Sequence, residues 1–243
     1  ANISVGTITP TSSTLTLTAS TDIVIGPYTI SGGASGHVLN LVFNAPTGVK
    51  SASAGNGVLN NYGSITFNSG CTVSCVAYSG TITNSNASVV VQGAGTTILS
   101  GSNSYTKGTD LIASSGAILK LGSDSALGSG PVSVRSGTTL DLGGSTITNA
   151  ITLYGGTITN SNSSSISTYS GAITLAATTS YFRAASSATL IVNISSFTHG
   201  DPSYGITYGS VSNTGTVILQ SLFDYSGITT ISAGTLQNGA NNV

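Results

Sequence analysis

The feature that most constrains this fold is a series of short runs in which apolar and polar residues alternate. Typical runs are Gly63–Phe67, Ala150–Leu153 and Gly215–Leu219. Each run has the period of two expected of a β-strand, and β-branched residues fill many of its positions. Gly, Asn or Ser bounds each run and supplies the turns. No segment has helical periodicity with capping residues, so the pattern predicts an all-β chain.

The runs also resemble one another, which favours a solenoid over a sandwich or barrel. The heptapeptide at Gly80–Asn86 recurs without change at Gly156–Asn162. Strands every eight to twelve residues would also suit a sandwich, but its exposed faces usually carry charges against edge aggregation, and here they carry Thr and Ser. We therefore predict a parallel β-helix of roughly ten to twelve coils, with about 20–25 residues per coil. Apolar ladders would fill its interior, and Asn and Thr would stack at its corners.

The low charge of the chain excludes several functional classes. Charged residues make up 5% of the 243 residues, and the net charge is −1. Five scattered cations cannot form the basic stripe of a nucleic-acid-binding protein. The longest apolar stretches are strand-sized, too short for a transmembrane helix. A net charge near zero favours association, which indicates a protein that assembles or adheres.

Two cysteines, Cys71 and Cys75, stand four positions apart. A local disulfide is the preferred interpretation, with two free thiols as the alternative, because a zinc site needs four ligands and both histidines are isolated in sequence. Such a bond fits an oxidising, extracellular setting. It would stiffen one turn rather than hold the fold, because the loop it closes is small. The sequence begins at Ala1 without a signal peptide, which we interpret as a mature secreted product or an excised fragment.

From about Gly93 onward the sequence resembles the autotransporter-associated β-strand repeats of bacterial autotransporter passenger domains. One copy covers Gly95–Gly122, and a second includes Gly215–Leu219 and Tyr225–Gln237. In both copies a tyrosine follows the first glycine by ten positions. The segment Asp124–Val134 after the first copy is also typical of that family.

The resemblance implies a right-handed parallel β-helix that is secreted and displayed at the cell surface. It says little about activity, because the repeat is a scaffold. We expect a single domain over residues 1–243, with divergent coils at 1–92 and repeat-type coils at 93–243.

Catalytic chemistry finds little support in the sequence. Carbohydrate-active β-helices need clustered carboxylates with a nearby cation. Asp124 and Asp141 could stack one coil apart with Lys120 and Arg135 near them, but turn residues of a repeat are the favoured interpretation. We expect no catalytic residue, no metal and no cofactor.

His199 and Asp201 also lie close together in sequence. Asp201 precedes a proline, which is typical of a turn. No nucleophile-bearing motif accompanies the pair, so the turn interpretation is preferred to a catalytic one.

The most aromatic loop region contains Phe197, Tyr204 and Tyr208. These rings are candidates for contact with a glycan or a partner molecule. The alternative, which we favour, is that they pack on the flank of the rod.

Neither terminus carries an amphipathic helix or a charged cap, although a β-helix exposes a sheet edge at each end. We therefore expect a secreted, non-enzymatic structural protein. It would be a surface adhesin stalk or the subunit of an extracellular fibre that assembles end to end with copies of itself. Cell-surface glycans or host surfaces are further candidate partners. The alternatives are a polysaccharide-binding module and a carbohydrate-active enzyme.

Overall fold

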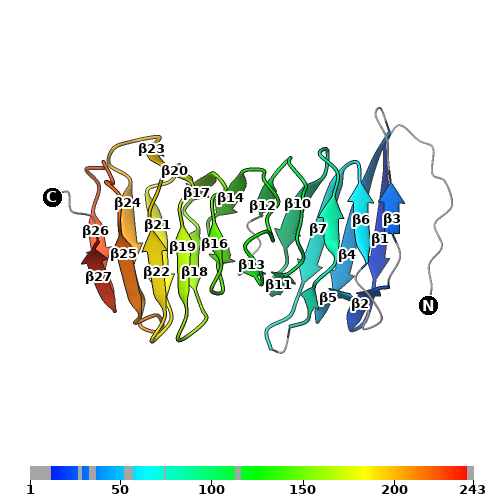
Figure 1. The fold of residues 1–243 in the computed structure, drawn as a ribbon, viewed down its shortest axis with the longest axis horizontal. Helices are drawn as coiled ribbons and strands as arrows, with labels where there is room; N and C mark the ends of the chain where they lie inside the picture. The colour runs from blue at the N-terminus through cyan, green and yellow to red at the C-terminus, as the bar shows by residue number, and fades with distance from the viewer. Residues whose placement is uncertain are drawn as a thin grey trace.

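The computed structural model describes residues 12–26, 29–32, 37–51, 57–73, 75–112 and 116–239. Throughout these ranges the named strands pair in parallel, and successive coils stack into an elongated rod with β1 near one end and β27 at the other (Figure 1). The predicted all-β solenoid is confirmed. Its right-handed sense stays a prediction, in line with the general handedness of parallel crossovers.

One nine-stranded sheet runs almost the whole length of the rod. It continues without a break past residue 92, where repeat-type coils were expected to begin. Its strands, in spatial order, are β1 (Ser12–Thr18), β4 (Val38–Ala45), β7 (Ser64–Ser69), β10 (Ser88–Gln92), β12 (Thr109–Leu111), β14 (Val132–Arg135), β17 (Ile151–Tyr154), β20 (Ala172–Leu175) and β23 (Ser196–His199).

The other strands form four shorter sheets. An eight-stranded sheet contains β8 (Ala77–Tyr78), β11 (Thr96–Leu99), β13 (Ile118–Leu121), β15 (Thr139–Asp141), β18 (Thr157–Asn160), β21 (Thr179–Ala184), β24 (Gly205–Tyr208) and β26 (Thr229–Ile231). Nearer the N-terminus lie a pair, β2 (Asp22–Ile25) and β5 (Gly48–Ser51), and a three-stranded sheet, β3 (Thr29–Gly32), β6 (Val58–Asn61) and β9 (Thr81–Thr83). A five-stranded sheet contains β16 (Thr146–Ile147), β19 (Ile166–Tyr169), β22 (Thr189–Val192), β25 (Thr216–Leu219) and β27 (Thr235–Asn238).

The coils vary in length. Ser12 pairs with Val38, 26 positions later, whereas Val132 pairs with Ile151, 19 positions later. The described residues make about nine turns, so the expectation of ten to twelve coils was wrong. After the first step of 26, the register spacings in the nine-stranded sheet are 19–24 positions, close to the assumed coil length. The last coil adds β26 and β27 but no described strand to this sheet.

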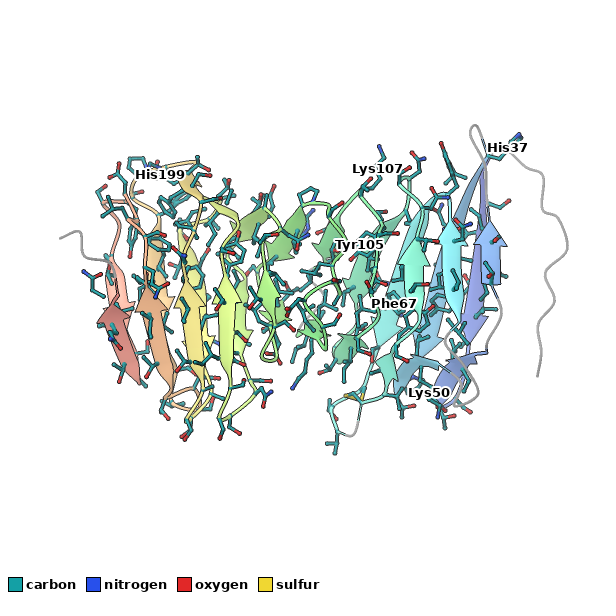
Figure 2. The ribbon with its side chains drawn as sticks, in the orientation of Figure 1. His37, Lys50, Phe67, Tyr105, Lys107 and His199 are labelled. Atoms are coloured by element: carbon teal, nitrogen blue, oxygen red, sulfur yellow. A yellow bond between two sulfur atoms is a disulfide. The ribbon has the colours of Figure 1, made fainter. Side chains whose placement is uncertain are left out.

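Aligned apolar side chains fill the interior, because alternate residues of each strand point inward and the register is kept from coil to coil. One ladder joins Leu17, Phe43, Phe67 and Val91 in successive strands. The rings of Phe43 and Phe67 lie 5.7 Å apart between centroids. Phe67 and Tyr105 lie inside the ribbon, whereas Lys50 and Lys107 lie at its periphery (Figure 2). The predicted apolar ladders are confirmed.

Polar ladders also form, as predicted for Asn and Thr. Asn68 Nδ2 donates to Asn44 Oδ1 at 3.0 Å. The hydroxyls of Thr174 and Thr198 share a hydrogen bond of 2.7 Å. Each bond links side chains of neighbouring coils, so these residues satisfy one another without any charged group.

Buried asparagines replace a missing strand ladder in the middle of the rod. The three-stranded sheet ends at β9 and the five-stranded sheet begins at β16. Between these two strands the described part of the chain forms loops, and no strand, on this side of the rod. Asn103 Oδ1 accepts from the Ile82 backbone N–H at 2.8 Å, and its Nδ2 donates to the Ala126 carbonyl at 2.6 Å. Asn149 Nδ2 donates to the Gly130 carbonyl at 2.8 Å. Together with single backbone bonds, such as that from the Ser104 N–H to the Ile82 carbonyl at 2.9 Å, these amides link the coils where no strands pair.

Candidate functional site

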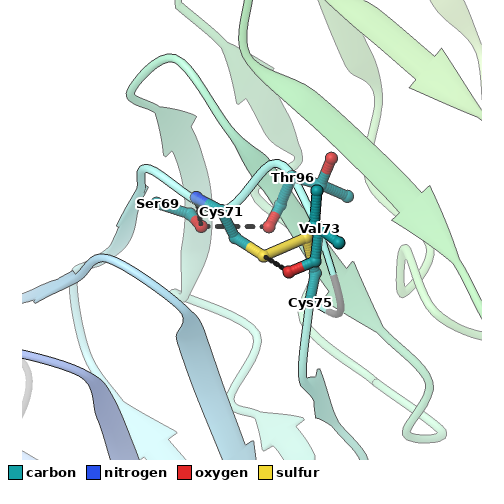
Figure 3. The surroundings of a disulfide bond; sticks show 5 residues. All are labelled: Ser69, Cys71, Val73, Cys75 and Thr96. Carbon is teal, nitrogen blue, oxygen red and sulfur yellow. Dashed lines mark hydrogen bonds between the residues drawn. A yellow bond between two sulfur atoms is a disulfide. The ribbon is translucent and has the colours of Figure 1, made fainter.

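The predicted disulfide is present: Cys71 and Cys75 are bonded, with their Cα atoms 5.5 Å apart (Figure 3). Cys71 is buried, and its backbone N–H donates to Ser69 Oγ at 3.2 Å. Ser69 Oγ in turn donates to the Thr96 carbonyl at 3.0 Å. Val73, within the loop, is 79% exposed. The bond therefore fastens a protruding loop to the rod where one coil passes to the next.

Reducing this disulfide is expected to leave the solenoid folded. In the chain-entropy model so short a loop is worth at most about 2 kcal/mol, and the coils on either side are held by their own strand pairings. Far-ultraviolet circular dichroism with and without a reductant should give the same β spectrum, while protease cleavage near Val73 should become faster. The double variant Cys71→Ser/Cys75→Ser serves as the control. Global unfolding on reduction would contradict the assignment of a local role.

Asp124 and Asp141, which the sequence suggested as a possible stacked pair, have separate structural roles. Asp141 lies 3.7 Å from Lys120 and accepts from the Ser161 backbone N–H at 2.9 Å. Asp124 instead accepts from the Thr146 backbone N–H at 2.8 Å. Both carboxylates are engaged in holding adjacent coils together.

Arg135 does not join Asp124 and Asp141, contrary to the arrangement considered from the sequence. It forms a bidentate pair with Asp110, with Nε–Oδ1 and Nη2–Oδ2 distances of 2.9 Å each. Strands β12 and β14 are neighbours in the nine-stranded sheet, which brings these two residues together. The described ranges contain no group of three or more His, Cys, Asp or Glu side chains placed to hold a metal ion.

His199 and Asp201 lie at the end of β23. Asp201 accepts from the Ser203 hydroxyl at 2.6 Å and from the Ser203 backbone N–H at 2.8 Å. These hydrogen bonds from Ser203 lower the pKa of Asp201. The His199 ring lies 5.9 Å from that of Phe197. The geometry at Asp201 is that of a tight turn, which matches the preferred interpretation of the sequence.

The aromatic residues selected as candidate contacts lie near the last coils. Tyr208 is buried, with its ring 6.0 Å from that of Phe182. Phe197 and Tyr204 are partly buried, and Phe197 packs 5.1 Å from Phe223 between centroids. Packing therefore accounts for much of their surface, and a role of these three residues in binding glycans or partners stays a prediction.

The last described coil leaves apolar positions open. Ile231 follows the buried Tyr208 in the same register but is 55% exposed. A pocket of about 410 Å³ lies here, lined by Tyr208, Leu219, Phe223, Leu236 and their neighbours. It is the continuation of the core beyond the last coil, so it has the form of a site for another coil.

Sequence reasoning missed the buried asparagines. They contact backbone groups of coils about 20 positions away in the chain, as Asn103 does with Ile82. The signal that could have found them is an Asn at a position where the alternating pattern places an inward-facing residue.

Comparison with known families supports the resemblance seen in the sequence. Residues 89–113 and 212–237 match the passenger-associated-transport-repeat model. The chain thus carries autotransporter passenger repeats on a parallel β-solenoid, as predicted. Such repeats are typical of secreted or surface-displayed proteins. No curated protein and no solved structure matches the chain. Within the described ranges no helix is long and apolar enough to cross a membrane.

Proposed function

We propose that the chain is a structural segment of a secreted surface protein, an adhesin stalk or an extracellular fibre, that assembles end to end with copies of itself. The passenger repeats support the secreted setting. The open last coil carries the assembly part of the proposal. Under this proposal the protein acts structurally: its stacked coils form a stiff rod, and rods join through their ends.

The exposed edge has both components needed for adding a strand. Within the described residues, β26 and β27 are the last strands of their sheets, each paired with one earlier strand, so they form the edge on which a further strand could be added. Beside them, Ile231 is exposed and Leu236 is partly exposed at positions that the register places in line with the core. A parallel coil laid on this edge would bury both side chains, as each earlier coil does for the one before it.

Purified protein of residues 1–243 is expected to form linear particles that lengthen with concentration, visible by light scattering and negative-stain electron microscopy. Ile231→Lys should abolish this growth, because a charge would be buried without a partner in each junction. Ile166→Lys is the matched control, since Ile166 is 59% exposed on the flank in β19 and should tolerate the same change.

A wild-type protein that stays monomeric at every concentration would refute the end-to-end proposal. Equal loss of assembly in Ile231→Lys and Ile166→Lys would refute the assignment of the junction to the last coil. Circular dichroism of each variant checks that the solenoid itself is intact.

A further inference from the structure

A second concave feature lies on the flank of the rod, away from the open end. It is a groove of about 560 Å³ formed where the nine-stranded sheet turns into the eight-stranded sheet in three successive coils. The turns that form it are 136–138, between β14 and β15, 155–156, between β17 and β18, and 176–178, between β20 and β21. Three stacked strands span about 10 Å between the outer two, so the groove has room for a short oligomeric ligand.

Hydroxyl groups dominate the walls of this groove. They come from Ser136, Thr139, Thr157, Thr178 and Thr179. Two glycines at the turns keep it open. An added Cβ at Gly137 would meet nothing within 4 Å, and both Gly137 and Gly155 have positive φ angles, of 77° and 81°. This lining suits a ligand that both donates and accepts many hydrogen bonds.

Two tyrosines border the groove, and each one is paired with an arginine. The Arg135 guanidinium lies 5.2 Å from the ring centroid of Tyr154, and that of Arg183 lies 4.8 Å from the ring centroid of Tyr181. These are the two arginines of the whole chain. Tyr154 is 40% exposed, so part of its ring is available to a ligand.

The two arginines differ in what neutralises them. Arg135 is held by Asp110. None of the carboxylates in the described residues pairs with Arg183, although its Nε is buried and finds no hydrogen-bond partner. Arg183 lines the groove, so it brings there a positive charge that no described carboxylate neutralises and that an anionic ligand could pair with.

We propose that this flank groove binds an acidic glycan. The carboxylate of a uronic-acid unit pairs with Arg183, a sugar ring packs against Tyr154, and the Ser and Thr hydroxyls bond the sugar hydroxyls. An aromatic surface, a hydroxyl-rich wall and one uncompensated guanidinium together favour this ligand over a neutral sugar or an apolar molecule. This binding is independent of the assembly at the rod end.

The test is isothermal titration calorimetry with three probes: oligogalacturonate, oligomannuronate and a hyaluronan fragment. At least one should bind, and its fully methyl-esterified form should bind at least about tenfold more weakly, the effect of losing one hydrogen bond to a charged group. Arg183→Gln should weaken binding of the acidic probe by about the same factor and leave the affinity for its methyl ester unchanged. Tyr154→Ala should weaken both.

Lys107→Gln is the matched control, because it removes the same charge from an exposed residue outside the groove and should change affinity by less than about twofold. Three outcomes would overturn the proposal: no acidic oligosaccharide binds, the methyl ester binds equally well, or Arg183→Gln has no effect. Equal binding of a tri-glutamate peptide would also overturn it, since the site would then recognise charge without sugar.

Discussion

Raising the pH above about 10 is expected to destabilise the solenoid steeply, because four tyrosines that are buried in the folded state ionise readily only when the chain unfolds. Burial raises the pKa of Tyr78, Tyr105, Tyr169 and Tyr208 well above the ordinary value for a phenol. The folded state keeps protons that the unfolded chain releases. The stabilisation is therefore complete below about pH 10 and is lost as the pH rises toward the folded pKa. In that window each buried tyrosine lowers the free energy of unfolding by about 1.4 kcal/mol per pH unit, so four lower it by about 5–6 kcal/mol per pH unit.

A titration followed by tyrosinate absorbance and far-ultraviolet circular dichroism measures this effect. A late absorbance step should coincide with loss of the β spectrum. Tyr208→Phe is the most informative variant, because the Tyr208 hydroxyl is buried without a hydrogen-bond partner. It should reduce the pH slope by about 1.4 kcal/mol per pH unit. Ionisation of all ten tyrosines with an unchanged β spectrum would contradict the prediction.

Replacing Asn103 by Leu is expected to lower the free energy of unfolding by about 2–6 kcal/mol. The change removes both hydrogen bonds of a buried amide and leaves the Ile82 N–H and the Ala126 carbonyl without partners, each at about 1–3 kcal/mol. Guanidinium unfolding monitored by circular dichroism measures the loss. Because stacked coils can unfold in separate steps, the loss is also consistent with a new unfolding transition at lower guanidinium concentration.

Asn162→Leu provides the matched control for this effect. Asn162 is exposed, and its side-chain Nδ2 donates to the Gly143 carbonyl at 3.2 Å. Because water can replace that bond, the same substitution should change stability by no more than about 0.5 kcal/mol. Equal losses for Asn103→Leu and Asn162→Leu would show that burial of the amide is not the cause.

The alternating runs were enough to predict the strands and their stacking, because one buried face per strand leaves a period of two in the sequence. The verbatim heptapeptides illustrate this: Gly80–Asn86 and Gly156–Asn162 begin strands β9 and β18 in the same manner. They lie in different sheets, however, which the sequence could not reveal. Identical local patterns specify a strand but not the side of the rod on which it lies.

Contacts between coils were less predictable, because they depend on the length of each coil. A place for Arg135 near Asp124 and Asp141 was considered from the sequence and not favoured, but its actual partner, Asp110, was not predicted. A change of a few residues in one coil shifts every later partner, and the spacing between paired residues ranges from 18 positions, Thr139 to Thr157, to 29 positions, Thr29 to Val58. The flank groove went unnoticed for the same reason, since its tyrosines and arginines come from three different coils.

The stretch between β9 and β16, where loops and asparagine amides replace one of the strand ladders, bears on how the rod responds to force. Where strands of successive coils pair in one sheet, bending or twisting would have to distort a continuous ladder of backbone bonds. In this stretch, one side is joined by side-chain bonds such as those of Asn103 and Asn149 and by single backbone bonds, such as that from the Ser104 N–H to the Ile82 carbonyl at 2.9 Å. Because these bonds are separate contacts rather than a regular ladder, we expect this stretch to deform more readily than the paired strands of the neighbouring sheets.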